Sequence, residues 1–131
     1  DSLDFSFSGM KTAVLYLLRG QDTKHGPDCA TVSPADLAAS FQEAVVDTLV
    51  TKLMRAARQE NLSHVALAGG VAANQRLREK LETACRKHRL TSTVPPPKLC
   101  TDNAAMVAGL ACRLFAEGKA SSLDLAATPE C

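Results

Sequence analysis

The sequence predicts an α/β fold with a short parallel sheet and covering helices. Two short β-prone runs, residues 65–68 and 90–94, are typical of strands, and a helical pattern follows each of them. This order of strand, helix, strand and helix implies parallel strands joined by a right-handed crossover. A parallel sheet needs both faces and its edges covered, which two or three strands do not achieve alone. We therefore expect the chain, which also lacks an initial Met, to be part of a longer protein.

The composition fits one ordinary globular domain. The 131 residues are 46% hydrophobic and 22% charged, which allows a real but modest core. A net charge of +1 gives no broad basic field, so charge alone predicts only weak, salt-sensitive contact with nucleic acid. No apolar run approaches the roughly 18 residues of a membrane span. We therefore expect no membrane contact. Five irregularly spaced cysteines favour a reduced, cytoplasmic protein.

Residues 1–32 are expected to form a strand, a helix and an exposed loop. Residues 4–8 alternate polar and apolar side chains, which is typical of a strand. From Met10 the apolar residues share one helical face, and Gly20 ends that pattern. Residues 21–32 are polar around Gly26 and Pro27, as in a loop.

Residues 33–118 are expected to form a βαβα core with a long covering helix, followed by a tail at 119–131. The long helix should run from residue 33 to about 59, with Ser33 as N-cap, Pro34 at the first position and Asp36 near the positive dipole end. Its apolar stripe predicts that it covers a sheet: Leu37, Phe41, Ala44, Val45, Leu49, Leu53 and Ala56.

The remaining elements should bury one face each. Residues 65–68 are apolar throughout, as in a strand buried on both faces. A helix at about 73–88 is expected to bury Leu77, Leu81, Ala84 and Cys85, with His88 as a further candidate. The last helix should start near residue 101 or 102, end at a glycine cap at residue 118, and carry an apolar face of Ala105, Ala108, Ala111, Cys112 and Phe115.

The first candidate site is the pair Gly69 and Gly70, between the first strand and its helix. Bare backbone N–H groups and the positive end of a helix meet there, and no side chain blocks the approach of a phosphate or nucleotide. The alternative is a tight turn without a ligand, which many α/β units need. Asn74, one turn further on, could reach a ribose or phosphate oxygen, or could simply cap or solvate its helix.

The second candidate site lies in residues 98–106, just past the second strand. Because neighbouring parallel strands end at one edge of a sheet, Asp102 and the two glycines should line one crevice. The Asp102 carboxylate offers hard oxygen ligands to a metal ion, and N-capping by an Asp, Thr or Asn at this place is the alternative.

A basic stretch in residues 76–89 could contact RNA phosphates, or could be a solvated helix face: Arg76, Arg78, Lys80, Arg86, Lys87 and Arg89. The three histidines show no metal spacing, and nothing places a serine beside a base. We therefore assign no residue a catalytic role.

Four segments in register resemble the TsaD/Gcp family, the tRNA N6-adenosine threonylcarbamoyltransferases once described as O-sialoglycoprotein endopeptidases (glycoproteases). They are residues 4–12, 38–46, 68–78 and 99–106, and the Ser-Phe-Gln form at 40–42 looks bacterial. The likeness covers residues 1 to about 118 and matches the C-terminal part of the family. It implies a lobe of an actin/Hsp70/sugar-kinase-like (ribonuclease H-like) fold whose N-terminal lobe is missing from this chain.

The resemblance also implies roles for particular residues. Asp102 matches a metal ligand, Asn74 matches a residue that contacts the nucleotide-like substrate, and Gly69 and Gly70 match the phosphate side of the cleft. The other family ligands form a His-x-x-x-His motif that this sequence lacks, so its site for one divalent metal, iron or zinc, would be incomplete.

The implied reaction moves a threonylcarbamoyl group from threonylcarbamoyl-adenylate to N6 of adenosine 37 in tRNA, the t6A modification. The implied partners are a TsaB-like paralogue and a TsaE-like ATPase. We expect the chain alone to be inactive, and to self-associate through apolar surface that the other lobe would cover. A non-catalytic nucleotide-binding or dimerisation module is the alternative, against which the intact Asp102 argues. A metallo-glycoprotease ranks last, because the sequence supplies neither a protease nucleophile nor a complete metal site.

Overall fold

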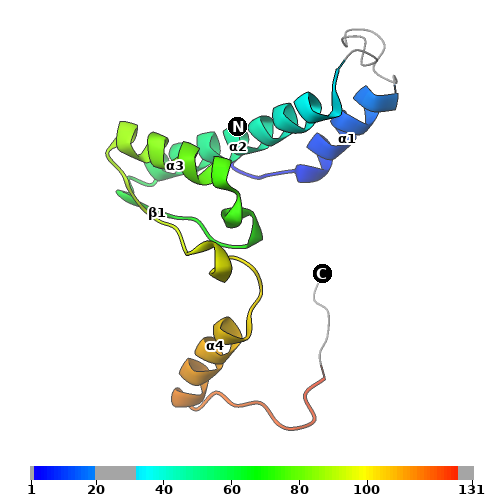
Figure 1. Ribbon diagram of the computed structural model, residues 1–131. Coiled ribbons are helices and arrows are strands. Elements are labelled where there is room, and N and C mark those ends of the chain that lie inside the picture. Colours follow the sequence, from blue (N-terminus) through cyan, green and yellow to red (C-terminus); the bar gives the residue numbers. More distant parts are fainter. Residues whose placement is uncertain (1, 20–31, 127–131) are drawn as a thin grey trace.

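The computed structural model describes residues 2–19 and 32–126 (Figure 1). The expected loop at 21–32 therefore lies outside the described residues, apart from residue 32. The α/β class and the short parallel sheet are confirmed. Among the described helices, none combines the length and apolarity that a membrane crossing requires. The elements are α1 (Phe7–Arg19), α2 (Pro34–Gln59), β1 (His64–Ala66), the 3-10 turn η2 (Gly70–Ala73), α3 (Gln75–His88), β2 (Thr91–Thr93), the 3-10 turn η3 (Pro97–Leu99) and α4 (Ala104–Ala116).

The sheet consists of β1 and β2, which pair in parallel with Val65 opposite Ser92. The Leu67 N–H extends the ladder by donating to the Thr93 carbonyl at 3.0 Å. Within β1 only Val65 is buried, so the expectation of a strand buried on both faces is wrong. The described helices α2 and α3 cover one face of these two strands, and a strand covered on one side buries alternate residues only (Figure 1).

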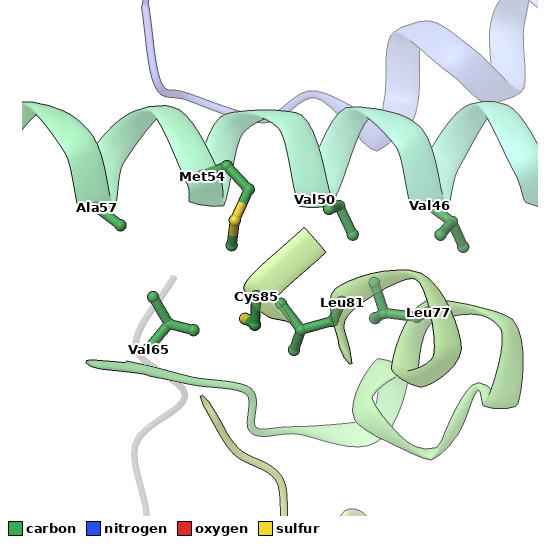
Figure 2. Packing of buried hydrophobic residues seen from close by; sticks show 8 residues of the cluster. All are labelled: Val46, Val50, Met54, Ala57, Val65, Leu77, Leu81 and Cys85. Carbon is green, nitrogen blue, oxygen red and sulfur yellow. The ribbon is translucent and has the colours of Figure 1, made fainter. Parts of the chain in front are cut away.

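Helix α2 begins as the sequence predicts. The Ser33 hydroxyl accepts a hydrogen bond from the Asp36 N–H at 3.1 Å, and Pro34 opens the helix. Its buried face is not the expected stripe, however, but a neighbouring one, made of Val46, Val50, Met54 and Ala57 (Figure 2). The expected stripe is wrong because α2 makes most of its contacts with α3 and fewer with β1, so the face turned toward α3 is the one buried deepest.

Helix α3 faces this stripe with Leu77, Leu81 and Cys85, which are four residues apart and share one helix face. Together with Val65 of β1 they form the core of the molecule (Figure 2). Burial of these residues is confirmed, whereas His88 is exposed. Desolvation in this core raises the pKa of the Cys85 thiol, which keeps it neutral.

The strand expected at residues 4–8 is not formed, because α1 already begins at Phe7. The Ser6 hydroxyl accepts from the Gly9 N–H at 3.3 Å and caps this first turn. Lys52 of α2 donates instead to the backbone carbonyl of Asp4. No described strand lies beside this segment, and without a pairing partner an alternating pattern gains nothing from strand geometry.

Helix α4 stands away from α2 and α3 (Figure 1). It ends as predicted, with Gly118 at a φ of 72° and its N–H donating to the Phe115 carbonyl at 3.0 Å. None of its residues is buried, so the expectation that Cys112 and Phe115 are core residues is wrong within the described structure. The helix is apolar nearly all round, and such a helix needs packing surfaces on several sides.

Candidate functional site

An open cleft of about 560 Å³ lies where the chain leaves the two strands. One wall is the glycine turn, Gly69 and Gly70, which follows β1. The other wall is the Asp102 loop, residues 95–102, which follows β2. The expected meeting of Asp102 and the glycines at the carboxyl edge of the sheet is thus what the structure shows. The full lining comprises Ala68, Gly69, Gly70, Pro95, Leu99, Cys100, Thr101, Asp102 and Met106.

The glycine turn presents open backbone to this cleft. Gly69 has a φ of 82°, a conformation that favours glycine, and a Cβ at either glycine would meet no atom within 4 Å. The α-helix does not begin at once, as the sequence suggests. The 3-10 turn η2 comes first, and its Ala72 N–H donates to the Gly69 carbonyl at 2.9 Å. The N–H groups of Gly70 and Val71 precede this bond and have no intrahelical acceptor, and binding of an anion by them stays a prediction.

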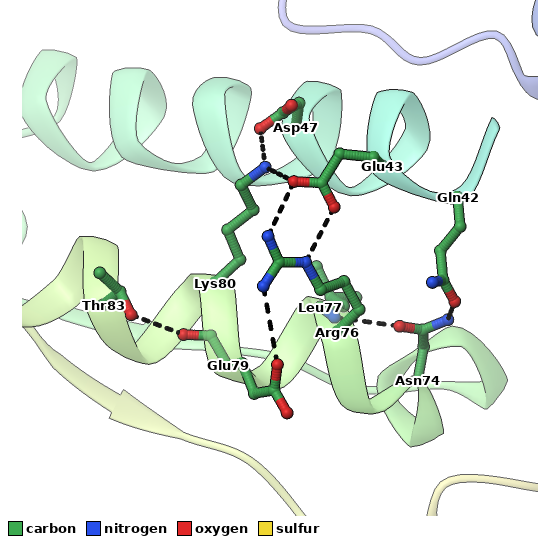
Figure 3. Close-up of polar contacts among 9 residues, drawn as sticks. All are labelled: Gln42, Glu43, Asp47, Asn74, Arg76, Leu77, Glu79, Lys80 and Thr83. Carbon is green, nitrogen blue, oxygen red and sulfur yellow. Dashed lines mark hydrogen bonds and ion pairs between the residues drawn. The ribbon is translucent and has the colours of Figure 1, made fainter. Parts of the chain in front are cut away.

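Asn74 is held within the chain by both ends of its amide. Its Oδ1 accepts from the Leu77 N–H at 3.0 Å, which caps α3, and its Nδ2 donates to Gln42 Oε1 at 3.0 Å (Figure 3). Asn74 is not among the residues that line the cleft. The capping interpretation is therefore confirmed, and contact with a ligand stays a prediction.

Asp102 lies exposed at the cleft, and capping of α4 falls to its neighbour. The Asn103 Oδ1 accepts from the Met106 N–H at 3.0 Å, and its Nδ2 donates to the Thr101 carbonyl at 3.0 Å. The capping alternative for Asp102 is thus wrong. Among residues 2–19 and 32–126 no three His, Cys, Asp or Glu side chains come together as a metal site. The described part of the chain therefore holds no complete three-ligand site, and the role of Asp102 as a metal ligand stays a prediction.

Sequence reasoning missed one residue of this region, Arg78 of α3. Its guanidinium is half-buried and donates to the Ala72 carbonyl at 2.6 Å, the Pro95 carbonyl at 2.6 Å and Cys100 Sγ at 3.2 Å. Arg78 thereby joins the turn after β1 to the loop after β2. The position of Arg78 in the sequence does not distinguish it from the other basic residues on α3. Its acceptors are mostly backbone carbonyls, and because every residue carries one, no residue type in the sequence marks these contacts.

A family model for TsaD, the tRNA N6-adenosine threonylcarbamoyltransferase, matches residues 1–109. The chain belongs to the TsaD family. It is 48% identical over 130 residues to the tRNA N6-adenosine threonylcarbamoyltransferases of a Bacillus cereus strain and of Bacillus anthracis. It is 45% identical over 129 residues to the protein of that name from Clostridium botulinum (strain Kyoto). Each match covers 98% of this chain but 37% of the relative, so the chain spans little more than a third of these proteins.

Much of the basic stretch on α3 of this TsaD-family chain is taken up by ion pairs. Arg76 donates to both carboxylate oxygens of Glu43 on α2, at 2.8 and 2.9 Å, and Lys80 pairs with Glu43 and Asp47 (Figure 3). The hydrogen bond from Arg76, followed by the one from Lys80, lowers the pKa of Glu43 to about 2. Arg76 and Lys80 thus join α2 to α3. Arg76 is nevertheless solvent-exposed, and contact of either side chain with RNA stays a prediction.

A second group of basic residues lies near the last turns of α2 and α3. Arg86 pairs with Glu82 within α3. A groove between α2 and α3 is lined by Arg55 and Arg58 of one helix and by Lys87 and His88 of the other. Cations are favoured near the negative C-terminal end of a helix dipole. This placement explains the cluster without a ligand, and contact with RNA stays a prediction.

Proposed function

We propose that this chain forms one side of the substrate cleft in a TsaD-type transferase, which moves a threonylcarbamoyl group to N6 of adenosine 37 in tRNA. The observation that carries the proposal is the shared cleft of the glycine turn and Asp102. Membership of the TsaD family and the names of the relatives support the same reaction. The element order of the chain is compatible with the C-terminal lobe, residues 1–131, of a two-lobed actin-like fold.

The donor, threonylcarbamoyl-adenylate, carries a phosphate that suits the glycine turn. The N–H groups of Gly70 and Val71 would donate to its oxygens, and Gly69 leaves the approach open. Asn74 would bind the nucleotide part only after its amide leaves Gln42, because the same NH2 group serves both. No side chain in the described residues is assigned a proton transfer.

Asp102 would be one ligand of a divalent metal, iron or zinc. A catalytic metal of this kind ordinarily takes three protein ligands, and the described residues bring no such group together. The remaining ligands would come from residues outside this segment. The chain alone would accordingly be inactive.

The partners in this proposal are tRNA, a TsaB-like paralogue and a TsaE-like ATPase, in the cytoplasm. The exposed apolar side chains of α4, among them Val107, Leu110 and Phe115, support self-association of the isolated chain. A clean monomer in light scattering at high concentration would contradict that part of the proposal.

A chimera tests the reaction. Residues 1–131 would replace the matching segment of the Bacillus cereus relative, and mass spectrometry would measure t6A in tRNA with the donor and partner proteins supplied. We expect the chimera to be active, and Asp102→Ala to lower its rate by at least about 100-fold, the upper range for residues that merely support metal ligands. Asp124→Ala removes an exposed carboxylate beyond α4 and should leave the rate unchanged. Full activity of Asp102→Ala, or transfer by the isolated chain, would contradict the proposal.

A further inference from the structure

We propose that Arg78 is a positioning residue that holds the Asp102 loop against the glycine turn and so sets the width of the cleft. The side chain comes from α3, behind the cleft, and is not among its lining residues. It therefore acts on the site through the backbone of both walls and not by touching a ligand.

The contacts of Arg78 span the two walls. Nε donates to the carbonyl of Ala72, in the turn that continues from Gly69 and Gly70, at 2.6 Å. One terminal nitrogen donates to the Pro95 carbonyl at 2.6 Å and to Cys100 Sγ at 3.2 Å. Hydrogen bonds from a charged donor are stronger than neutral ones, and a planar guanidinium presents several donors in fixed directions. A lysine ammonium on a flexible stem does not reproduce this arrangement.

Apart from the packing of η3 against η2, the Asp102 loop has few contacts that hold it there. Strand β2 ends at Thr93, before the loop begins, and the loop's own bonds are local, such as Cys100 N–H to the Pro97 carbonyl at 3.1 Å. In the described structure, Arg78 donates every hydrogen bond that joins residues 95–102 to the η2–α3 segment. Helix α4, on the far side of the loop, has no buried residue with which to anchor it.

Cys100 reports on this arrangement. The residue is 5% exposed. Its Sγ accepts from Arg78 and lies 3.5 Å from the Pro96 carbonyl oxygen. Two other cysteines serve as internal standards, since Cys85 is buried in the main core and Cys112 is exposed on α4. If Arg78 holds the loop, its removal should uncover Cys100 and leave the other two unchanged.

The test measures the alkylation rate of each cysteine by iodoacetamide in the native 131-residue chain, resolved by peptide mass spectrometry. In Arg78→Met we expect Cys100 to react at least about tenfold faster, since loss of charge-assisted bonds allows local opening. Loss of a cation beside a thiol would by itself slow alkylation, so an acceleration reports exposure. Arg76→Met is the matched control, because Arg76 pairs with Glu43 on the other side of α3 and should leave the Cys100 rate unchanged.

Two results would overturn the proposal: an unchanged Cys100 rate, or an equal acceleration of Cys85 and Cys100, which would mean general loosening. If circular dichroism shows that Arg78→Met does not fold, Arg78→Lys replaces it. Its Cys100 rate should then lie above that of the unaltered chain, and an unchanged rate would overturn the proposal.

The consequence for catalysis rests on the proposed function. In the chimera, Arg78→Met should lower kcat while the KM for tRNA stays the same, because the donor site is misaligned and the tRNA surface is not. An unaltered chimera without activity would count against the proposed function and leave the thiol result standing. If Arg78→Met raised the KM for tRNA and left kcat unchanged, a role of Arg78 in positioning the donor site would be contradicted.

Discussion

Helices α3 and α4 begin alike but end up in different surroundings. Each starts at an asparagine, Asn74 or Asn103, whose Oδ1 accepts a backbone N–H at 3.0 Å. Helix α3 then buries Leu77, Leu81 and Cys85, whereas α4 buries no residue. Local signals thus suffice to start a helix. Its burial depends on whether the rest of the chain offers a matching apolar face.

This difference extends to the cleft, because each wall leads into one of these helices. The glycine turn runs into α3 and so rests on the core. The Asp102 loop runs into α4, which has no core of its own in the described structure. Arg78 connects the two walls, because it donates hydrogen bonds to the turn that follows the glycines and to the Asp102 loop.

The largest expected effect comes from truncating matched leucines in the two helices. Leu81 is 1% exposed, and Leu81→Ala should destabilise the chain by about 3 kcal/mol through lost burial and a residual cavity. Leu110 of α4 is 61% exposed, and Leu110→Ala should change the free energy of unfolding by less than about 0.5 kcal/mol. Urea unfolding followed by circular dichroism measures both. Equal losses in the two variants would show that α4 is packed as closely as α3.

A smaller effect should come from the two helix caps. Asn74→Ala removes the cap of α3 and the bond to Gln42, and should cost about 1 kcal/mol. Asn103→Ala removes the same kind of cap from α4, where fraying does not propagate to the core. We expect it to lower helix content slightly and to leave the midpoint of urea unfolding of the core unchanged. A shift of that midpoint as large as for Asn74→Ala would show that α4 is coupled to the core.

These contrasts also show which features the sequence could predict. Caps and ends depend on neighbouring residues, so Ser33 and Gly118 were predictable. The meeting of Asp102 with the glycines followed from the rule that parallel strands end at one edge. Such rules use only local sequence or topology.

Other features depend on contacts that no local pattern specifies. Helix α2 carries two adjacent apolar stripes, and the position of α3 decides that Val50 and Met54, and not Leu49 and Leu53, lie deepest. Arg78 binds backbone carbonyls distant in sequence, so its residue type gave no signal. Helix α4 has no packing partner among the described residues, which the apolar pattern of the helix does not reveal.

The smallest effect should appear in the dependence of stability on pH. The pKa of Glu43 is lowered from 4.5 to about 2 by Arg76 and Lys80, so its contribution is present above pH 4.5 and is lost as pH falls towards 2. Glu43→Gln should make the urea midpoint less dependent on pH in that window. Lys119 and Arg113 likewise lower the pKa of Glu117, just after α4. Because α4 is not packed on the core, Glu117→Gln should keep the pH profile of the unaltered chain, and a flattened profile would count against the separation.

We infer that the chain completes the core beneath the glycine turn but offers α4, which follows the Asp102 loop, no core to pack against. Amide hydrogen exchange tests it directly when α3 and α4 are compared in the isolated chain and in the Bacillus cereus chimera. At concentrations low enough to keep the isolated chain monomeric, we predict that α3 is protected in both proteins and that α4 is protected only in the chimera, where further packing surface is present. Protection of α4 equal to that of α3 in the isolated chain would contradict the account.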